Sequence, residues 1–280
     1  PFLNVLYQFE KIIPKNRLYR VYKRYLNAYL KRKANGMSSY SIPLNILKYF
    51  NLTEDKFDFR SSDGLDGHRS LFIDLDKKGL TTYYDAFTSL NFVKSSSDKE
   101  RRDDVVDKIT GEYNFFPIYQ AVMDQRGHDF GPESQEVKQS LVEFDAQLAE
   151  FYNKVLARNP ETKFVFLGDH GMTNVVDSID FESKFKRFRD IYGFKLGIDF
   201  IYFLDSTIMR TWFFSDKVED AFKRFFLTDD EVTLKGSFLD EKEAIKQHIP
   251  LGDSRYGDMI WMANNGVLVY PDFFHRTKMY

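Results

Sequence analysis

The sequence contains no cysteine, which excludes disulfide bonds and thiolate metal ligands but is compatible with any cellular compartment. It has no apolar run of about 18 residues, so we expect no transmembrane segment. The chain starts with Pro1 instead of Met, and its first residues lack the features of a signal peptide, so localisation is left open. The formal net charge of -2 gives no overall attraction to nucleic acid, and we expect no nucleic-acid partner.

The composition is typical of a folded globular protein. Hydrophobic residues make up 43% of the 280 residues and charged residues 29%. The 29 Phe and 17 Tyr supply enough ring surface for a sizeable core. This length allows one large domain or two smaller ones. We predict a basic helical segment over residues 1–60 and an α/β core over residues 61–280.

Residues 1–35 are locally basic, with nine Lys or Arg against one Glu, and Tyr and Phe lie between them. One interpretation is an amphipathic helix whose Leu, Val and Tyr side chains face the core. The other is a surface for an anionic partner. Both remain open at the level of sequence.

Apolar periodicity predicts helices in four places, residues 44–50, 69–80, 133–159 and 216–226. The second should end at Gly79, since glycine readily adopts the left-handed conformation that ends a helix. Strand-like patterns occupy residues 81–87, 115–124, 163–169, 199–214 and 259–270. We expect 199–214 to form two strands around a turn, and 259–270 to form a hairpin with Asn-Gly in its turn.

Residues 115–169 read as strand, long helix and strand. This order is typical of a βαβ unit, in which parallel strands are covered by helices. The predicted fold class is therefore α/β, with helices flanking the sheet.

Four polar residues follow the two strands of this unit. Asp124 and His128 come at the end of the first strand, and Asp169 and His170 end the second. Because parallel strands end at the same edge of a sheet, we expect these side chains to converge. Carboxylate and imidazole suit zinc, and also manganese or iron. Taken singly, each residue also fits an ordinary turn or a surface position.

Two motifs resemble those of the type I phosphodiesterase/nucleotide pyrophosphatase family, which belongs to the alkaline phosphatase superfamily. The pattern D-x-x-G-H-x-x-G-P occupies residues 124–132, and D-H-G-M occupies residues 169–172. The segment 69–80 and the R-Y-G-D run at 255–258 fit the family's usual order. The resemblance implies an alkaline-phosphatase-like, mostly parallel sheet flanked by helices, with a smaller helical and β cap region.

The resemblance also implies a metal-dependent hydrolase of phosphodiester or pyrophosphate bonds. Such enzymes hold two divalent metal ions, usually zinc, with manganese as the other choice here. Asp124 and His128 would ligate one ion, and Asp169 and His170 the other. A Thr or Ser nucleophile would form a phospho-enzyme, and the substrate would be a phosphate-ester small molecule or a nucleotide.

The sequence departs from the family pattern at the nucleophile and at the last metal histidine. The Thr, Ser and Asp-Gly positions that we weighed for the nucleophile region fit poorly: Ser38, Ser39, Asp63-Gly64, Thr81 and Thr82. His275 is a doubtful last ligand, while His248 fits a helix end and His68 a loop. We therefore expect an internal piece of the enzyme, incomplete at both ends, with the nucleophile upstream of Pro1 and the last histidine just after Tyr280. Such a chain alone should be inactive or nearly so.

Two alternatives differ from this hypothesis. A phosphomonoesterase, phosphomutase or sulfatase of the same superfamily would share the D-H-G motif. A non-catalytic module would instead use the basic segment to bind an anionic polymer or a membrane surface, in a salt-sensitive way.

Overall fold

The computed structural model describes residues 12, 14, 17–33, 42–50, 68–84 and 97–274. The chain forms two compact units. Unit 1 comprises Pro1–Tyr29, Ser39–Asn51 and Thr173–Tyr280, and unit 2 comprises Leu30–Ser38 and Leu52–Met172. The expected boundary near residue 60 lies outside the described residues, so the division into 1–60 and 61–280 stays a prediction. Within the described ranges, no helix is long and apolar enough to cross a membrane.

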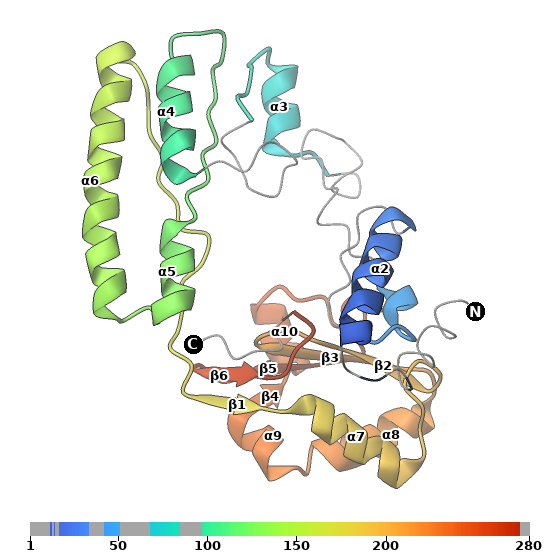
Figure 1. The fold of residues 1–280 in the computed structure, drawn as a ribbon. Helices are drawn as coiled ribbons and strands as arrows, with labels where there is room; N and C mark the ends of the chain where they lie inside the picture. Colours follow the sequence, from blue (N-terminus) through green and yellow to red (C-terminus); the bar gives the residue numbers. More distant parts are fainter. Residues whose placement is uncertain are drawn as a thin grey trace. The chain divides into compact units, whose positions relative to one another are not determined.

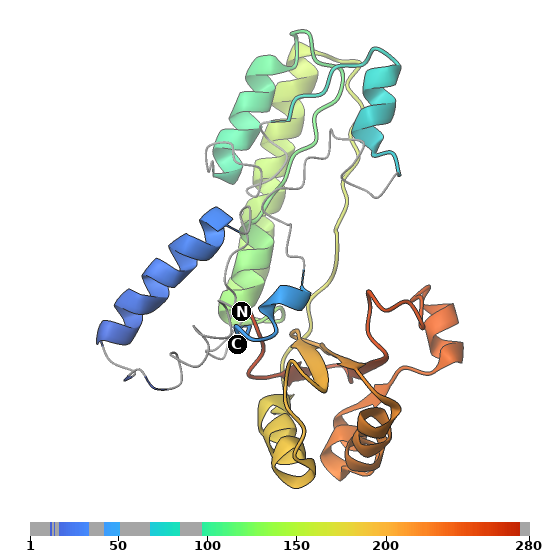
Figure 2. The ribbon, with the colours of Figure 1, turned by 90° about the vertical axis from the view of Figure 1, so that its right-hand side faces the viewer.

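Unit 2 is built from helices, which are α3 (Leu71–Lys77), α4 (Asp98–Lys108), α5 (Val122–Phe130) and α6 (Gln135–Arg158). Helix α6 runs beside α4 and α5, as Figures 1 and 2 both show. The core of this unit lies between α4, the C-terminal half of α6 and the segment around Tyr83. It contains Tyr83, Val105, Val106, Ile109, Phe151 and Val155. Full burial of each such side chain contributes roughly 1.5–3 kcal/mol.

Unit 1 contains two sheets. The larger has the order β2 (Phe200–Leu204), β3 (Ile208–Phe213), β5 (Met259–Ala263) and β4 (Gly236–Phe238), and every pairing in it is antiparallel. The smaller pairs β1 (Asp177–Ile179) in parallel with β6 (Val267–Val269). The mixed α/β class is therefore confirmed, and a parallel pair is present. In the described residues, however, the four-stranded sheet is antiparallel and not mostly parallel as expected.

The helices of unit 1 that follow β1 are α7 (Phe181–Tyr192), α8 (Asp216–Phe226), α9 (Asp230–Lys235) and α10 (Glu241–Lys246). Helices α7 and α8 lie on one side of the larger sheet (Figure 1). The apolar positions of α7 recur at helical spacing, so one stripe of rings points at the sheet. Those rings and their partners are fully buried, namely Phe181, Phe185, Phe188, Phe222, Phe226 and Trp261. Edge and stacked contacts between them add to the area that they bury.

Two further elements precede the rest of the fold. Residues Arg17–Lys33 form helix α2, as the basic segment predicts. Leu26 of this helix is buried, but Val21 and Tyr25 are exposed, so only part of the expected core-facing stripe is covered. The short helix expected over residues 44–50 is a turn followed by the 3-10 helix η1 (Leu47–Tyr49).

Several sequence predictions are confirmed by these elements. Helix α6 begins after Ser134, whose hydroxyl accepts a hydrogen bond from the Val137 N–H and so caps the helix. Helix α3 is followed by Gly79 with a φ of 70°, the left-handed conformation expected there. Helix α8 and the β2–β3 hairpin also lie where the periodicity places them.

The strand predicted over residues 115–124 is wrong. Within it, only Phe115 makes a bridge, in parallel to Thr82, and the chain enters α5 at Val122. Pro117 has no N–H to donate to a ladder, and a short apolar run does not distinguish a strand from a segment leading into a helix. The bridge at Thr82 is also what is seen of the strand predicted over 81–87, since residues 85–87 lie outside the described ranges.

The strand predicted over residues 163–169 is also wrong. No described residue forms a ladder with it, and Val165 and Leu167 are 79% and 88% exposed. An apolar pattern shows a tendency toward burial, but a strand exists only where a neighbouring strand supplies its hydrogen bonds. The expected βαβ unit is therefore absent from the described part of the chain.

The hairpin predicted over residues 259–270 is wrong in its pairing. Its turn is present, with Gly266 at a φ of 83° and the Val267 N–H donating to the Asn264 carbonyl. The two strands nevertheless separate, because β5 joins the larger sheet and β6 pairs with β1.

Candidate functional site

Helix α5 carries the first Asp-His pair. Asp124 lies in its first turn and His128 in its last, four residues apart and therefore on one face. The distance between His128 Nε2 and Asp124 Oδ1 is 3.4 Å, and both side chains are 45% exposed. The pair is thus accessible to solvent and oriented within one helix.

The start of α5 is capped by a residue from another helix. Ala121 precedes α5 and makes no side-chain cap of its own. Instead, the carboxylate of Asp98, at the start of α4, accepts hydrogen bonds from the N–H groups of Ala121 at 3.0 Å and Val122 at 2.9 Å. Asp98 is available for this because Ser97 and Glu100 form the capping box of α4. The first turn that carries Asp124 is therefore fixed by α4.

Arg101 holds Asp98 and Tyr119 in place. Its guanidinium is buried, lies 2.9 Å from Asp98 Oδ1, and donates a hydrogen bond of 3.2 Å to the Tyr119 carbonyl. It also lies over the Tyr119 ring, 5.7 Å from the ring centre. Burial raises the pKa of Tyr119, and the negative charges of Asp124 and Asp169 raise it further.

The second pair lies in the extended segment after α6. His170 Nε2 is 3.7 Å from Asp169 Oδ2, and both side chains are exposed. The His170 N–H donates to Asp169 Oδ1 at 2.9 Å, while His170 Nδ1 lies 3.1 Å from the Gly171 carbonyl oxygen. These contacts are local, so they orient the two side chains relative to each other without a strand.

A close contact joins the two motifs within unit 2. A Cβ placed on Gly127 of α5 would lie 2.7 Å from Met172 Sδ and 3.0 Å from Met172 Cε. Because Gly127 has no side chain, the Met172 thioether packs directly on α5 at this residue, which lies between Asp124 and His128 in the sequence. The G-H motif and the D-H-G-M motif are therefore side by side through Gly127 and Met172.

Comparison with known families gives one match that spans both motifs. The sequence model of the type I phosphodiesterase/nucleotide pyrophosphatase family matches residues 28–272. The chain belongs to this family. A search of curated protein sequences finds no significant match to it.

Solved structures with a similar fold include an ectonucleotide pyrophosphatase/phosphodiesterase from mouse and from human. Inactive murine ectonucleotide pyrophosphatase/phosphodiesterase 5 in complex with AMP is 16% identical to this chain, with a TM-score of 0.54. The matched region covers 74% of this chain and 56% of the murine chain. The human protein of that name is 15% identical with a TM-score of 0.59, covering 83% and 62%. The chain thus spans little more than half of these structures, and the likeness shows the fold.

Because the chain belongs to the type I phosphodiesterase family, its Asp and His side chains can be compared with the requirements of a divalent-metal site. The donor types fit a divalent cation, since carboxylate oxygen and imidazole nitrogen ligate zinc and manganese. Within the described ranges, however, no three or more His, Asp or Glu side chains gather at one point. The members of each Asp-His pair lie close to each other, but the four side chains do not gather at one point as expected from the sequence.

The other positions weighed from the sequence fall into two groups. Ser38, Ser39, Asp63, Gly64 and His275 lie outside the described residues. The Thr81 hydroxyl is hydrogen-bonded to the Glu112 carbonyl and to Asn114 Oδ1, and Thr82 is buried. His68 and His248 are exposed, and His248 belongs to unit 1, whereas all four Asp-His residues belong to unit 2.

Sequence reasoning missed three residues around the first pair. Asp98, Arg101 and Tyr119 organise the start of α5, although none belongs to either of the two family motifs. A signal for Asp98 exists in the sequence. Ser97 and Glu100 already complete a capping box, which leaves the carboxylate between them free to cap another helix.

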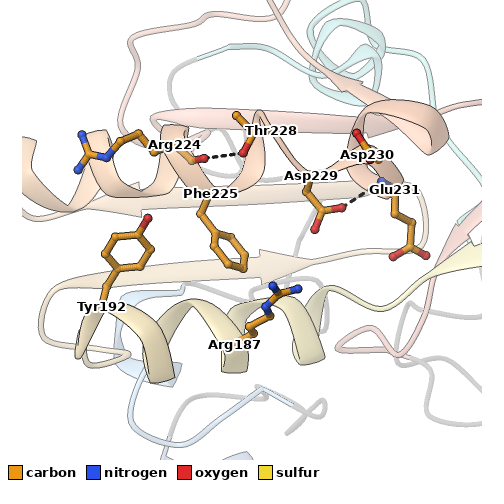
Figure 3. Close-up of a pocket in the computed structure, with 8 residues that line it drawn as sticks. All are labelled: Arg187, Tyr192, Arg224, Phe225, Thr228, Asp229, Asp230 and Glu231. Atoms are coloured by element: carbon orange, nitrogen blue, oxygen red, sulfur yellow. Dashed lines mark hydrogen bonds between the residues drawn. The ribbon is translucent and has the colours of Figure 1, made fainter.

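Unit 1 contains a second group of polar side chains around an open hollow of about 400 Å³ (Figure 3). Its cationic and aromatic side includes Arg187, whose guanidinium carbon lies 5.8 Å from the centre of the Phe225 ring. On its acidic side, Asp229 and Glu231 form ion pairs with Lys184. These carboxylates are therefore engaged in holding α7 to α9, and the hollow contains no residue of the family motifs.

Proposed function

We propose that this protein is a metal-dependent hydrolase of phosphodiester or pyrophosphate bonds, with its metal ligands on unit 2. The observation that carries the proposal is the contact between Gly127 and Met172, which joins the two Asp-His motifs of the family. Similarity to solved phosphodiesterase structures supports the same overall fold, including an alkaline-phosphatase-like arrangement of the complete enzyme.

In this proposal, Asp124 and His128 hold one divalent ion, and Asp169 and His170 hold a second. Zinc is the first choice and manganese the other. When bound, two such ions supply Lewis acidity and neutralise charge on the phosphoryl oxygens and the leaving group. Hydrolysis through a phospho-enzyme, as the family resemblance implies, is part of the proposal.

The chain's own residues have three tasks in this site. The helix geometry of α5 sets the spacing between Asp124 and His128. Asp98, through its hydrogen bonds to the first N–H groups of α5, fixes where that helix begins. Tyr119 is neutral near pH 7 and its raised pKa extends the neutral form to higher pH, so its hydroxyl is a candidate hydrogen-bond donor to an anionic substrate.

A nucleotide-type substrate, or another small phosphate ester, fits this chemistry. The murine relative of known structure is described in complex with AMP. A phosphoryl group brings negative charge to the two Asp-His pairs, where the cations would balance it.

Zinc affinity, measured by competition with a chromophoric chelator, tests the proposed ligands. We expect Asp124→Asn and His128→Gln each to weaken zinc binding at least about 10-fold, since even indirect partners of metal ligands have effects of that size. Asp129→Asn, on the same helix, and His248→Gln, in unit 1, are matched controls and should leave the affinity unchanged. Equal losses in controls and test variants, or no zinc binding by the unaltered protein, would contradict the proposal.

A further inference from the structure

Helix α2 concentrates positive charge on one element. Its 17 residues include seven Lys or Arg and no Asp or Glu. The whole sequence has a formal net charge of -2, so the remainder of the chain is acidic on balance. This helix therefore carries a net positive charge, whereas the rest of the chain carries a net negative charge.

The helix presents a mixed basic and apolar face to solvent. Arg17, Val21, Arg24 and Tyr25 are spaced so that they share one side of the helix, and all four are exposed. Val21 is 40% exposed and Tyr25 is 72% exposed. Leu26 is buried and, at 100° per residue, lies on the opposite side from Arg17 and Val21. The exposed face thus combines cations with an aliphatic and an aromatic side chain.

We propose that this face of α2 docks the protein on a membrane surface that contains anionic lipid headgroups. Helices that lie in the membrane interface have basic residues that meet the headgroups and apolar residues that enter the boundary with the acyl chains. Each Lys or Arg near an anionic surface contributes to binding, and a tyrosine ring suits a site with one apolar and one wet end. Seven cations in 17 residues place the helix on the membrane and not across it.

The apolar residues favour a membrane over a soluble polyanion. A polyanion binds cationic side chains through its phosphate or sulfate groups, and most of that affinity is electrostatic. Exposed Val21 would gain nothing from such a partner, whereas the acyl boundary of a bilayer removes it and the Tyr25 ring from water.

Vesicle flotation with the full chain tests this inference. The vesicles are phosphatidylcholine with or without phosphatidylserine, and heparin beads serve as the soluble polyanion. The first test variant combines Arg17→Glu with Arg24→Glu. Its matched control combines Lys217→Glu with Lys242→Glu, two exposed residues near the starts of α8 and α10. The second test variant is Tyr25→Ser, which leaves the charge unchanged.

We expect binding to vesicles only when phosphatidylserine is present. The α2 double variant should bind at least about 30-fold more weakly, and the control should bind as the unaltered protein does. Tyr25→Ser should weaken vesicle binding and leave heparin binding unchanged. Vesicle binding that is absent, independent of phosphatidylserine, equally lost in the control, or insensitive to Tyr25→Ser would overturn the proposal; in the last case, heparin binding would identify a polyanion as the partner.

Discussion

At the scale of single residues, Lys184 shows how one side chain joins two helices of unit 1. Its ammonium lies 2.8 Å from the carboxylate of Asp229 and 2.8 Å from that of Glu231, which ties α7 to the start of α9. Burial opposes the charged form and lowers the pKa of Lys184, but the hydrogen bonds to both carboxylates outweigh it and leave the pKa raised. Burial likewise favours a higher pKa for Asp229, which Lys184 and the Val232 N–H reverse.

Replacing Lys184 should therefore destabilise unit 1. Lys184→Met removes the cation and leaves Asp229 mostly buried without its partner, so we expect a loss of about 2 kcal/mol or more in urea unfolding. Lys186→Met, on the same helix, is the control. It breaks an exposed pair with Asp190, and its cost should stay below about 0.5 kcal/mol. Equal losses of unfolding free energy in the two variants would show that the buried ion pair of Lys184 stabilises the protein no more than the exposed pair of Lys186 does.

The stability difference between Lys184→Met and the unaltered protein should depend on pH. The pKa of Asp229 is lowered from 3.8, so its contribution is present above that value and is lost as the pH falls through the folded-state pKa. The pKa of Lys184 is raised from 10.5, so its contribution is present below that value and is lost as the pH rises through the folded-state pKa. Unfolding measured across pH should show the largest difference between these limits, and a flat profile would contradict the assignment.

At the scale of elements, helix α5 depends on α4 for its first turn. Asp98 supplies the cap that Ala121 lacks, and Arg101 pairs with the same carboxylate. Asp98→Ala should cost about 3 kcal/mol, because it removes a helix cap and leaves the buried Arg101 without its anion. Asp103→Ala, also on α4, loses only an exposed pair with Lys99 and should cost less than about 0.5 kcal/mol.

Thermal or urea unfolding checks this prediction, together with zinc affinity. If Asp98 positions Asp124, the Asp98→Ala variant should bind zinc more weakly under conditions where it is still folded. A variant that loses stability but keeps full zinc affinity would show that Asp98 supports the helix without positioning the ligand.

The elements that could be predicted from the sequence are those whose stability is local or nearly so. Helix α6 carries its own cap at Ser134 and a long apolar periodicity, and β2 and β3 are joined by a short turn. The end of α3 follows from Gly79, because the residue type itself permits the conformation. Each of these depends on residues close together in the chain.

The wrong predictions depend on partners far away in the chain. Residues 163–169 have the composition of a strand, but no described residue forms a ladder with them. The chain enters α5 at Val122 because Asp98, 24 residues earlier, accepts its N–H. Strand β6 pairs with β1, about 90 residues earlier, and not with β5, the strand that precedes it in the chain. The register of Val267 with Asp177 shows this pairing. Hydrophobic periodicity does not indicate which distant strand or side chain a segment will pair with.

Only part of the candidate site could be predicted, because its assembly also depends on residues that are far apart in the chain. Asp124, His128, Asp169 and His170 were found by motif, and the contact of Gly127 with Met172 places the two motifs together. The expected convergence of the four side chains, at the edge of two parallel strands, is not observed in the described part of the chain. Whether the four side chains bind metal stays a prediction.

At the scale of the whole molecule, the two units differ in which residues they contain. Unit 1 contains the dense aromatic core around Phe185, Phe222 and Trp261, while the four proposed ligands belong to unit 2. The family match over residues 28–272 runs through both units. The chain spans between 55% and 62% of the solved relatives, so activity and substrate of the whole enzyme are proposals that rest on the site in unit 2.

The most direct test of the central claim is an anomalous-scattering map at the zinc edge, from crystals of this protein grown with zinc. The account predicts peaks beside Asp124 and His128 and beside Asp169 and His170. The number of peaks would also show whether each pair binds its own ion. Ordered zinc elsewhere with no density at either pair, or the four side chains directed apart, would contradict the assignment of these residues as metal ligands.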